Sequence, residues 1–322
     1  MNSMELIRAW SSMLRCSEQE VVKLIVSAPY RYRHYQIPKR TGGMRDIYHP
    51  TPELKAVQRW LNTNMFGMLP IHDSVCSYRV GMGVKAHAKR HLNANYVLRL
   101  DFKDFFPSIN IEWLENFFVA QSAAGLMPCD SGAANLMAWM ACRRGKKGGA
   151  TALSIGAPSS PVISNAILYE FDLAAFDFCS ANDCEYSRYA DDIYISSRAP
   201  NVIGAIEVEV RRLVSEKLPL LALNQDKTIN TSRKRRIIVT GLNITSDRKI
   251  SIGRELKREI KTQIYLWSVG RLDVLDANRL KGLLSYVKDV EPSFLESLEA
   301  KFGVDLIEKL TSSKPSVDEI PF

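Results

Sequence analysis

Residues 185–196, EYSRYADDIYIS, place two adjacent aspartates, Asp191 and Asp192, between two short runs of aromatic and β-branched residues. This pattern predicts a strand, a tight turn and a second strand, with both aspartates in the turn. Adjacent carboxylates repel each other unless a cation lies beside them. A solvated Asp-Asp turn is the common alternative, but the apolar strands on both sides argue against it.

A third carboxylate, Asp101, follows a strand predicted for Tyr96–Leu100. Two Mg²⁺ ions about 3.5–4 Å apart require hard oxygen ligands from separate pieces of chain. One ion lowers the pKa of an attacking hydroxyl, and the other neutralises charge on leaving phosphate oxygens. Asp101, Asp191 and Asp192 are therefore candidate ligands for two Mg²⁺ ions, with Mn²⁺ as an alternative.

The rest of the chain predicts a mixture of hairpins and helices. Helices are expected over the first thirty residues, and a glycine turn is expected at Thr41-Gly42-Gly43. Strands joined as hairpins, with helices to one side, favour an α+β layer over a doubly wound sheet. The further elements expected are helices over 111–142, 161–182 and 202–218, a strand pair over 236–244, and helices from about 253 to the end.

Composition bounds the class of protein. At 322 residues the chain has room for about two domains, and 46% hydrophobic and 24% charged residues are ordinary for a globular protein. A run of about 18 apolar residues and a secretory signal are both lacking, so we expect a cytoplasmic protein without a membrane partner. Six cysteines without a C-x-x-C pair indicate reduced thiols. The net charge of +8 suits a polyanionic partner but also occurs in proteins that bind none.

Two further segments have residue types that suit nucleotide binding. Small residues in 156–161, GAPSSP, would let a nucleotide or template strand pass close to the backbone before a helix. Lys39 and Arg45, on either side of the glycine turn, could clamp a triphosphate. A plain helix N-terminus and a solvated charged hairpin are the alternatives for the two segments.

Together these motifs resemble those of reverse transcriptases. Tyr189-Ala190-Asp191-Asp192 is similar to their polymerase signature, and LDFKDFFPSI, residues 100–109, to their first aspartate motif. The other matches are the fingers motif IPKRTGGMRDI at 37–47, the template motif GAPSSPVISN at 156–165 and the lysine motif LNQDKT at 223–228.

Three details resemble retron enzymes within that family. His87-Ala88-Lys89-Arg90-His91 stands where they usually carry N-A-x-x-H, and Val239-Thr240-Gly241 reproduces their V-T-G triplet. The tail 280–303 is similar to the thumb of bacterial reverse transcriptases. From the residues alone, the two histidines read as a solvated helix face, and a zinc site would lack a third ligand.

The resemblance implies an α+β right-hand polymerase. Fingers are expected at 1–95 with the N-terminal helical lead, and a palm at 96–245 with inserted finger-side helices around 111–150. A helical, RNA-binding thumb is expected at 246–322.

It also implies roles for single residues. Asp101, Asp191 and Asp192 would be catalytic and, with the Phe102 carbonyl, would hold the metals. Phe106 would exclude the 2′-hydroxyl of ribonucleotides. The dNTP would also contact Lys39, Arg45, Gly156 and Lys227, the last a candidate acid for the leaving pyrophosphate. Contacts with RNA or template are expected from His91, Pro158, Val239, Thr240, Gly241, Arg254, Lys257, Arg258 and Lys261.

The last four of these residues fall at helical spacing, where a basic face would follow phosphates or simply be solvated. Two residues depart from the family pattern. The template motif usually reads L-P-Q-G, whereas Leu153-Ser154-Ile155-Gly156 lacks the Gln amide, and His87 replaces the usual Asn.

As a retron reverse transcriptase, the protein would copy its cognate noncoding RNA (msr-msd). It would prime from a guanosine 2′-hydroxyl and make branched, RNA-linked single-stranded DNA (msDNA) from dNTPs. The family acts in anti-phage defence with an effector encoded beside it. No ribonuclease H motif is visible, so template removal would fall to a host ribonuclease H. The alternatives are a group II intron or diversity-generating reverse transcriptase, an RNA- or msDNA-binding scaffold that restrains an effector, and a plain RNA-binding protein.

Overall fold

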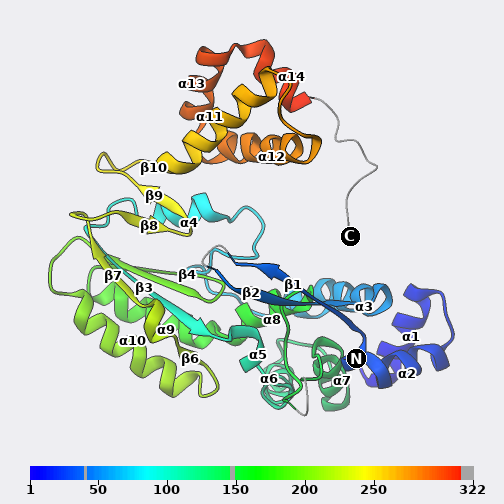
Figure 1. Cartoon of the computed structure of the whole chain (residues 1–322). Helices are drawn as coiled ribbons and strands as arrows, with labels where there is room; N and C mark the ends of the chain where they lie inside the picture. Colours follow the sequence, from blue (N-terminus) through cyan, green and yellow to red (C-terminus); the bar gives the residue numbers. More distant parts are fainter. Residues whose placement is uncertain (40–41, 146–148, 313–322) are drawn as a thin grey trace. The chain divides into compact units, whose positions relative to one another are not determined.

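The computed structural model describes residues 1–39, 42–145 and 149–312, which divide into two compact units (Figure 1). The first unit comprises residues 1–78, 98–195 and 201–229. The second comprises residues 79–97, 196–200 and the chain from 230 onward. Each unit therefore combines segments that are far apart in the sequence.

The first unit begins with two short helices and a hairpin. Helices α1 (Ser3–Leu14) and α2 (Glu18–Ser27) confirm the predicted helical lead, and each starts with a reciprocal capping box. Strands β1 (Tyr32–Pro38) and β2 (Met44–Pro50) form the predicted antiparallel hairpin. Gly42 has φ +87°, which suits a turn, whereas Thr41 lies outside the described residues.

The central sheet of this unit has the strand order β4-β5-β3-β6. Strands β4 (Cys184–Tyr189) and β5 (Asp192–Ser197) confirm the predicted strand-turn-strand. Strand β3 (Tyr96–Lys103) lies between β5 and β6 (Ala222–Leu223). Because β5 and β3 are neighbouring strands, the β4–β5 turn lies next to the end of β3.

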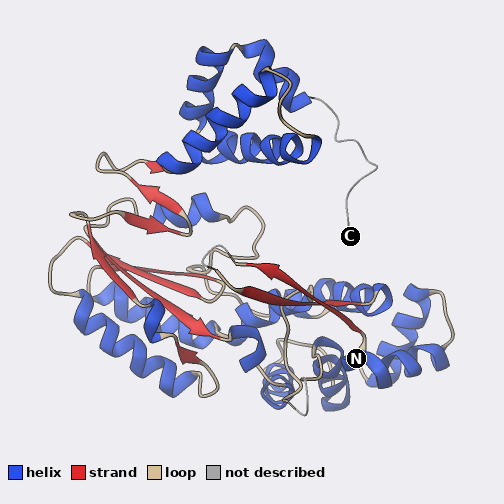
Figure 2. Ribbon diagram, in the orientation of Figure 1, coloured by secondary structure: helices blue, strands red, loops and turns tan. Residues whose placement is uncertain are grey.

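Helices α9 (Tyr169–Ala181) and α10 (Ile203–Lys217) lie side by side beneath this sheet (Figure 2). Phe171 of α9 packs against Phe102 of β3 and Tyr186 of β4, with ring centroids 6.2 and 6.5 Å apart. Helix α10 confirms the helix expected at 202–218. The helices of the unit that follow the hairpin are α3 (Pro52–Asn64), α5 (Phe105–Ser108), α6 (Ile111–Ala123), α7 (Ser131–Ala141), α8 (Ser159–Ile167), α9 (Tyr169–Ala181) and α10 (Ile203–Lys217).

Two long helices predicted from the sequence are each divided in the structure. The helix expected at 111–142 is broken between α6 and α7, where Gly125 has φ +73° and Pro128 follows. The helix expected at 161–182 is two helices, α8 and α9, separated at Leu168. Pro161 does lie in the first turn of α8, as predicted.

The second unit contains a small sheet and a group of helices. Its sheet has the order β10-β9-β8 and confirms the strand pair expected at 236–244. Thr240 and Gly241 connect β8 to β9 with φ +47° and +83°, the signs that a two-residue type I′ hairpin turn requires. The elements of this part are α4 (Val84–Arg90), β7 (Ile229–Ser232), β8 (Ile237–Val239), β9 (Leu242–Ile244), β10 (Ile250–Ser251), α11 (Arg254–Ser268), α12 (Val274–Val290), α13 (Pro292–Phe302) and α14 (Val304–Ser312).

The four C-terminal helices pack in sequence order, through buried residues such as Ile260, Leu284 and Leu298. They confirm the helical tail predicted from residue 253. Among the residues that the structure describes, no helix has the length and apolarity to cross a bilayer.

Candidate active site

The three predicted carboxylates come together in the first unit. Asp101 lies on β3, Asp191 lies in the turn between β4 and β5, and Asp192 is the first residue of β5, so only one of the two adjacent aspartates is in the predicted turn. The Phe102 N–H donates to the Asp191 carbonyl oxygen over 3.1 Å, which fixes the two segments side by side. Asp101 is 3% exposed, whereas Asp191 and Asp192 are half-buried.

Negative charge is concentrated at this site. Burial raises the pKa of Asp191, and the neighbouring Asp101 raises it further, while Lys227 and Arg45 act in the opposite direction. Burial raises the pKa of Asp192 to about 6, and Asp191 and Asp101 add to this rise, although Arg99 opposes it. Cations beside Asp191 and Asp192 therefore favour the ionised form of these two carboxylates.

One such cation, Arg99, was absent from the sequence-based prediction. Its Nε donates to Asp192 Oδ1 over 2.9 Å, and its Nη2 donates to Oδ1 and Oδ2 over 2.8 and 3.0 Å. Alternate residues of a strand share a face, so Arg99 and Asp101 lie on the same face of β3. A basic residue two positions before the first aspartate was the signal that could have identified it.

Lys227 provides the second cation, and its assignment to this site was predicted. It lies in the short helical turn η4 (Gln225–Lys227), directly after β6 pairs with β3. Its Nζ is 2.8 and 3.1 Å from the two carboxylate oxygens of Asp101. The Asn224 N–H also donates to the Asp101 carbonyl over 2.7 Å, which holds this turn against β3.

The donor atoms fit a divalent oxygen-binding ion. Three carboxylates and the backbone carbonyl of Phe102 are hard ligands of the kind that Mg²⁺ prefers. Within the described ranges, no three His, Cys, Asp or Glu side chains form a cluster ready to hold a metal. Arg99 and Lys227 bind two of the three carboxylates instead.

The hairpin brings one of its two predicted phosphate ligands to the site. Arg45 of β2 is near enough that its charge lowers the pKa of Asp191. Lys39 follows the last residue of β1 and is exposed, and its backbone N–H donates to the Gly43 carbonyl over 2.9 Å. The structure describes no side-chain contact that joins Lys39 to the carboxylates.

Phe106 is connected to the site through neighbouring aromatic rings. It is half-buried in α5, with its ring centroid 5.2 Å from that of Phe105. Phe105 stacks in turn on Phe102, at a centroid distance of 5.6 Å and an interplanar angle of 14°. Ring contacts therefore connect Phe106, which is expected to exclude ribonucleotides, to Phe102, the residue that follows Asp101.

The template motif packs against the hairpin. Gly156 has φ +109°, and a Cβ placed there would lie 2.7 Å from the Tyr48 carbonyl oxygen. The Tyr48 N–H also donates to the Ile155 carbonyl over 2.8 Å. Close approach of β2 therefore requires glycine at this position, whatever contact the nucleotide makes. Pro158 occupies the N-cap position of α8, and its carbonyl accepts from Asn62 Nδ2 over 2.8 Å.

In the second unit the two histidines are buried, so the alternative interpretation as a solvated helix face is wrong. His87 Nδ1 is hydrogen-bonded to Thr240 Oγ1, and His91 Nδ1 to Ser196 Oγ over 2.8 Å. Burial lowers the pKa of His87 to about 2 and that of His91 to about 3. Both rings are therefore neutral at physiological pH.

Two of the residues expected to bind RNA are inaccessible to it. His91 and Val239 are fully buried, which leaves neither side chain a surface for direct contact with RNA. The hydrogen bond between His87 and Thr240 joins the two retron-like motifs to each other. The two motifs therefore contribute to the packing of the second unit, and in the β8–β9 turn Thr240 is half-buried and Gly241 is exposed.

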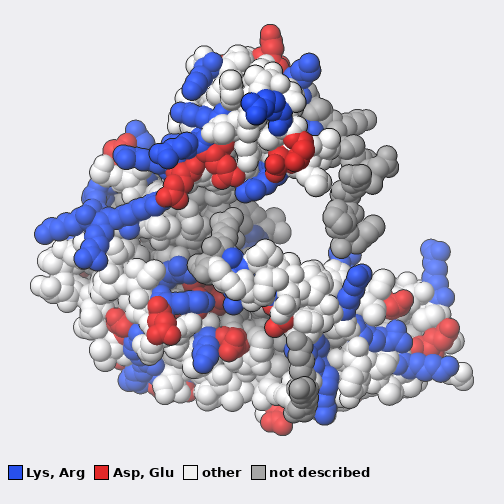
Figure 3. Space-filling view, in the orientation of Figure 1, with Lys and Arg blue, Asp and Glu red and all other residues white. Residues whose placement is uncertain are grey.

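The predicted basic face of α11 is only partly free. Arg254, Arg258 and Lys261 are exposed, but Lys257 binds Glu291 and lies 5.0 Å from the centroid of the Phe294 ring. Lys and Arg side chains gather over the start of α11 and around β8–β10 (Figure 3). An exposed basic turn before β8, which the sequence-based interpretation missed, consists of Lys234, Arg235 and Arg236.

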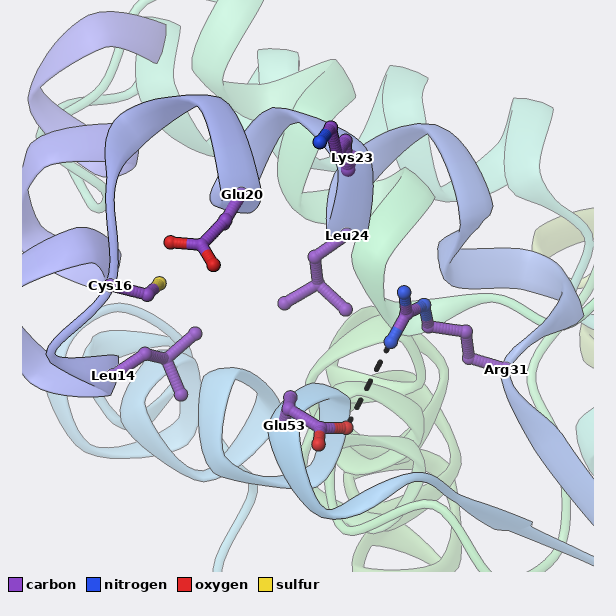
Figure 4. A pocket seen from close by; sticks show the side chains of 7 residues that line it. All are labelled: Leu14, Cys16, Glu20, Lys23, Leu24, Arg31 and Glu53. Carbon is purple, nitrogen blue, oxygen red and sulfur yellow. Dashed lines mark ion pairs between the residues drawn. The ribbon is translucent and has the colours of Figure 1, made fainter.

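A separate pocket of 390 Å³ lies among the N-terminal helices and the start of α3 (Figure 4). An ion pair of 3.9 Å between Arg31 and Glu53 crosses part of its wall. None of its lining residues belongs to the carboxylate site, so we do not assign it to nucleotide binding. The lining residues are Leu14, Cys16, Glu20, Lys23, Leu24, Arg31 and Glu53.

Comparison with known proteins identifies the family. The family described as "Reverse transcriptase (RNA-dependent DNA polymerase)" matches residues 37–244, from the hairpin to the end of β9. The retron Ec83 reverse transcriptase of Escherichia coli is 36% identical over 281 residues, which cover 87% of this chain and 89% of that protein. This chain belongs to the retron reverse transcriptases. The retron Ec73 reverse transcriptase of Escherichia coli is 31% identical over 289 residues, covering 86% of this chain and 89% of that protein.

A solved structure supports the fold of this retron reverse transcriptase. Telomerase from Candida albicans, in complex with a fragment of telomeric RNA, matches with a TM-score of 0.50 and 14% identity. The match covers 85% of this chain and 54% of the telomerase chain, so the retron enzyme spans about half the length of that chain. The expected right-hand polymerase fold is confirmed, and the enzyme is an RNA-directed DNA polymerase.

Proposed function

We propose that this retron reverse transcriptase copies its cognate noncoding RNA (msr-msd) and primes synthesis from the 2′-hydroxyl of an internal guanosine. The product is msDNA, a single-stranded DNA joined to RNA through a branch. The observation that carries the polymerase chemistry is the convergence of Asp101, Asp191 and Asp192 beside Lys227 and Arg45. Membership of the retron family supports the proposals of self-priming and of the cognate RNA as template.

The proposed chemistry assigns each side chain a task. Asp101, Asp191, Asp192 and the Phe102 carbonyl would hold two Mg²⁺ ions, which when bound neutralise charge on phosphate oxygens. Lys227, whose Nζ binds Asp101, would donate a proton to the leaving pyrophosphate.

The remaining tasks concern the nucleotide. Arg45 and Lys39 would bind the triphosphate of the incoming dNTP. Phe106 would exclude ribonucleotides by contact with the 2′-hydroxyl.

The proposed setting is cytoplasmic anti-phage defence. The enzyme and its msDNA would restrain an effector protein encoded by an adjacent gene, and a host ribonuclease H would remove the copied template. The exposed basic residues around β8–β10 and α11 support RNA binding by the second unit.

The decisive experiment is to purify the protein from its native host with its neighbouring genes present, and to sequence the nucleic acid that copurifies. We expect a short DNA joined 2′–5′ to a structured RNA. RNA without attached DNA would overturn the self-priming proposal. The matched control is the double variant Asp191→Ala/Asp192→Ala, which should retain the same RNA without any DNA.

A second candidate function, a scaffold in which synthesis is secondary, is favoured by one observation. None of the three carboxylates lies in the second unit, so the basic surface is built separately from the active site. The same double variant tests it in cells that carry the effector. If the variant still restrains the effector, synthesis is dispensable for control; if the effector is released, the scaffold proposal fails.

A further inference from the structure

The residue before the catalytic Asp191 has an unusual backbone conformation. Ala190 has φ +57°, in the left-handed region that favours glycine over residues with a Cβ. Such a conformation persists only where surrounding contacts enforce it. Because Asp191 is the next residue, the direction of its carboxylate depends on the conformation of Ala190.

Both polar backbone atoms of Ala190 are held by side chains. Its N–H donates to Ser77 Oγ over 2.7 Å, and its carbonyl oxygen accepts from Arg188 Nη1 over 3.0 Å. Ser77 is fully buried and its own carbonyl accepts from Asn165 Nδ2 over 3.0 Å. Buried side chains of the first unit therefore hold the turn through both the N–H and the carbonyl of Ala190.

Arg188 is oriented by a complete set of buried partners. Its side chain is fully buried, and its Nε and Nη2 donate to the two oxygens of Asp172 over 2.8 and 2.6 Å. Its Nη1 also donates to Asn165 Oδ1 over 3.2 Å. Tyr186 adds a hydrogen bond of 2.7 Å from its hydroxyl to Asp172.

A buried ion pair often contributes little to the free energy of folding. Removing two charges from water costs free energy, and well-packed apolar residues often replace such pairs without loss of stability. What an apolar pair would not supply is the donor that reaches the Ala190 carbonyl. The planar guanidinium can bind Asp172 in bidentate fashion and still have a third nitrogen for the turn.

We propose that Arg188 is a positioning residue for catalysis. Together with Ser77 it holds Ala190 in the left-handed conformation and so directs the Asp191 carboxylate toward Asp101. Asp172 and Asn165 orient Arg188 for this task. The inference rests on the proposed role of Asp101 and Asp191 as ligands of a divalent ion.

The first test removes one hydrogen bond without leaving a buried charge. In the full-length enzyme with its RNA, we expect Ser77→Ala to lower kcat roughly tenfold, with KM for dNTP within about twofold. Mn²⁺ binding, measured by electron paramagnetic resonance without dNTP, should weaken by a similar factor. The matched control is Ser122→Ala, which removes a hydrogen bond to the Cys129 carbonyl and should change neither quantity.

A double-variant cycle isolates the turn. Glycine adopts positive φ without strain, so Ala190→Gly should make the turn less dependent on Ser77. We expect Ser77→Ala to cost less in the Ala190→Gly background than in the wild type. Equal costs in both backgrounds would overturn the proposed route through Ala190.

The second test replaces the buried pair without relying on a charged core. The triple variant Arg188→Met/Asp172→Leu/Tyr186→Phe should fold with a Tm near that of the wild type. We expect its kcat and Mn²⁺ affinity to fall at least as far as those of Ser77→Ala. A folded triple variant with full activity and Mn²⁺ affinity would show that Arg188 is merely structural. Failure of the wild type to bind Mn²⁺ would instead refute the proposed metal site itself.

Discussion

Arg99 binds Asp192 through two nitrogens, at N–O distances of 2.8–3.0 Å, in a site that also contains Asp101 and Asp191. The pair offsets one of three clustered negative charges. Arg99 is one-third exposed and Asp192 is 17% exposed, so solvent screens the interaction in part. The guanidinium therefore competes with any divalent ion for the same carboxylate.

This competition gives a prediction for Arg99→Gln. Without the guanidinium, Asp192 is free to bind a cation, and the Mg²⁺ concentration for half-maximal activity should fall by about threefold to fivefold. The measurement is primer extension over a Mg²⁺ titration at pH 8. Arg212→Gln, which breaks surface pairs on α10, serves as the control and should leave the titration unchanged. A higher Mg²⁺ requirement for Arg99→Gln would contradict the prediction.

Asp191→Asn should stabilise the metal-free protein. The pKa of Asp191 is raised above its ordinary 3.8, so its ionised form costs folding free energy at neutral pH. We expect a gain of about 2 °C in Tm at pH 7.5 in the presence of EDTA. The gain should disappear as the pH falls through the raised pKa toward 4, because the wild-type carboxyl then becomes neutral. Mg²⁺ should raise the Tm of the wild type more than that of the variant.

The buried histidines predict sensitivity to acid. Their pKa values of about 2 and about 3 lie below the ordinary 6.5, so the unfolded chain takes up protons first as the pH falls. Stability should therefore decline below pH 6.5, by about 1.4 kcal/mol per pH unit for each histidine.

His87→Asn should remove one of these two contributions. Hydrogen exchange of the α4 amides at pH 7.5, 6 and 5 measures the effect locally. His34→Asn, at a half-exposed histidine of the hairpin, is the control. If the protection factors of these amides fall equally with pH in His87→Asn and in the wild type, the acid sensitivity does not come from His87.

Gly156→Ala should destabilise the first unit by about 2–3 kcal/mol, because it adds a Cβ at φ +109° against the Tyr48 carbonyl. Gly204→Ala in α10 is the matched control, since a Cβ there has nothing within 4 Å. The control should be neutral or stabilising by up to about 1 kcal/mol. Urea unfolding of both variants measures the difference, and equal effects would contradict the packing argument.

Phe106→Ala should relax sugar selection. Loss of the ring removes the steric clash with a 2′-hydroxyl, so the ratio of rNTP to dNTP incorporation should rise at least about tenfold. Single-nucleotide extension with matched dNTP and rNTP measures it. Phe117→Ala on α6, another half-buried phenylalanine, should leave the ratio unchanged. An unchanged ratio in Phe106→Ala would remove this residue from the proposed nucleotide site.

Local patterns predicted the strands and their turns well. The hairpin at Gly42-Gly43, the β4–β5 turn and the β8–β9 pair follow from alternation and from turn residues. The long helices were wrong at their breaks, because apolar residues continue through segments that contain Gly125 and Leu168. Periodicity alone cannot detect a break that leaves the apolar pattern intact.

The sequence-based analysis predicted the three carboxylates and the nearby cations Lys227 and Arg45, but it missed Arg99, Arg188 and Ser77. Asp101 and the Asp191-Asp192 pair follow directly after or between recognisable strands, so neighbouring strands bring them together. Arg99, Arg188 and Ser77 act through tertiary contacts that no local pattern encodes. The burial of His87 and His91 was missed for the same reason, since a polar helix with basic neighbours reads as solvated.

The hydrogen bond between His87 and Thr240 has a consequence for exchanging parts between retron enzymes. The two motifs are far apart in the sequence, yet the buried His87 of one is hydrogen-bonded to Thr240 of the other. A graft of the V-T-G segment alone would pair a new turn with an unmatched α4. Chimeric enzymes designed to accept a different RNA should therefore transfer residues 84–91 and 237–244 together, as one inherited piece.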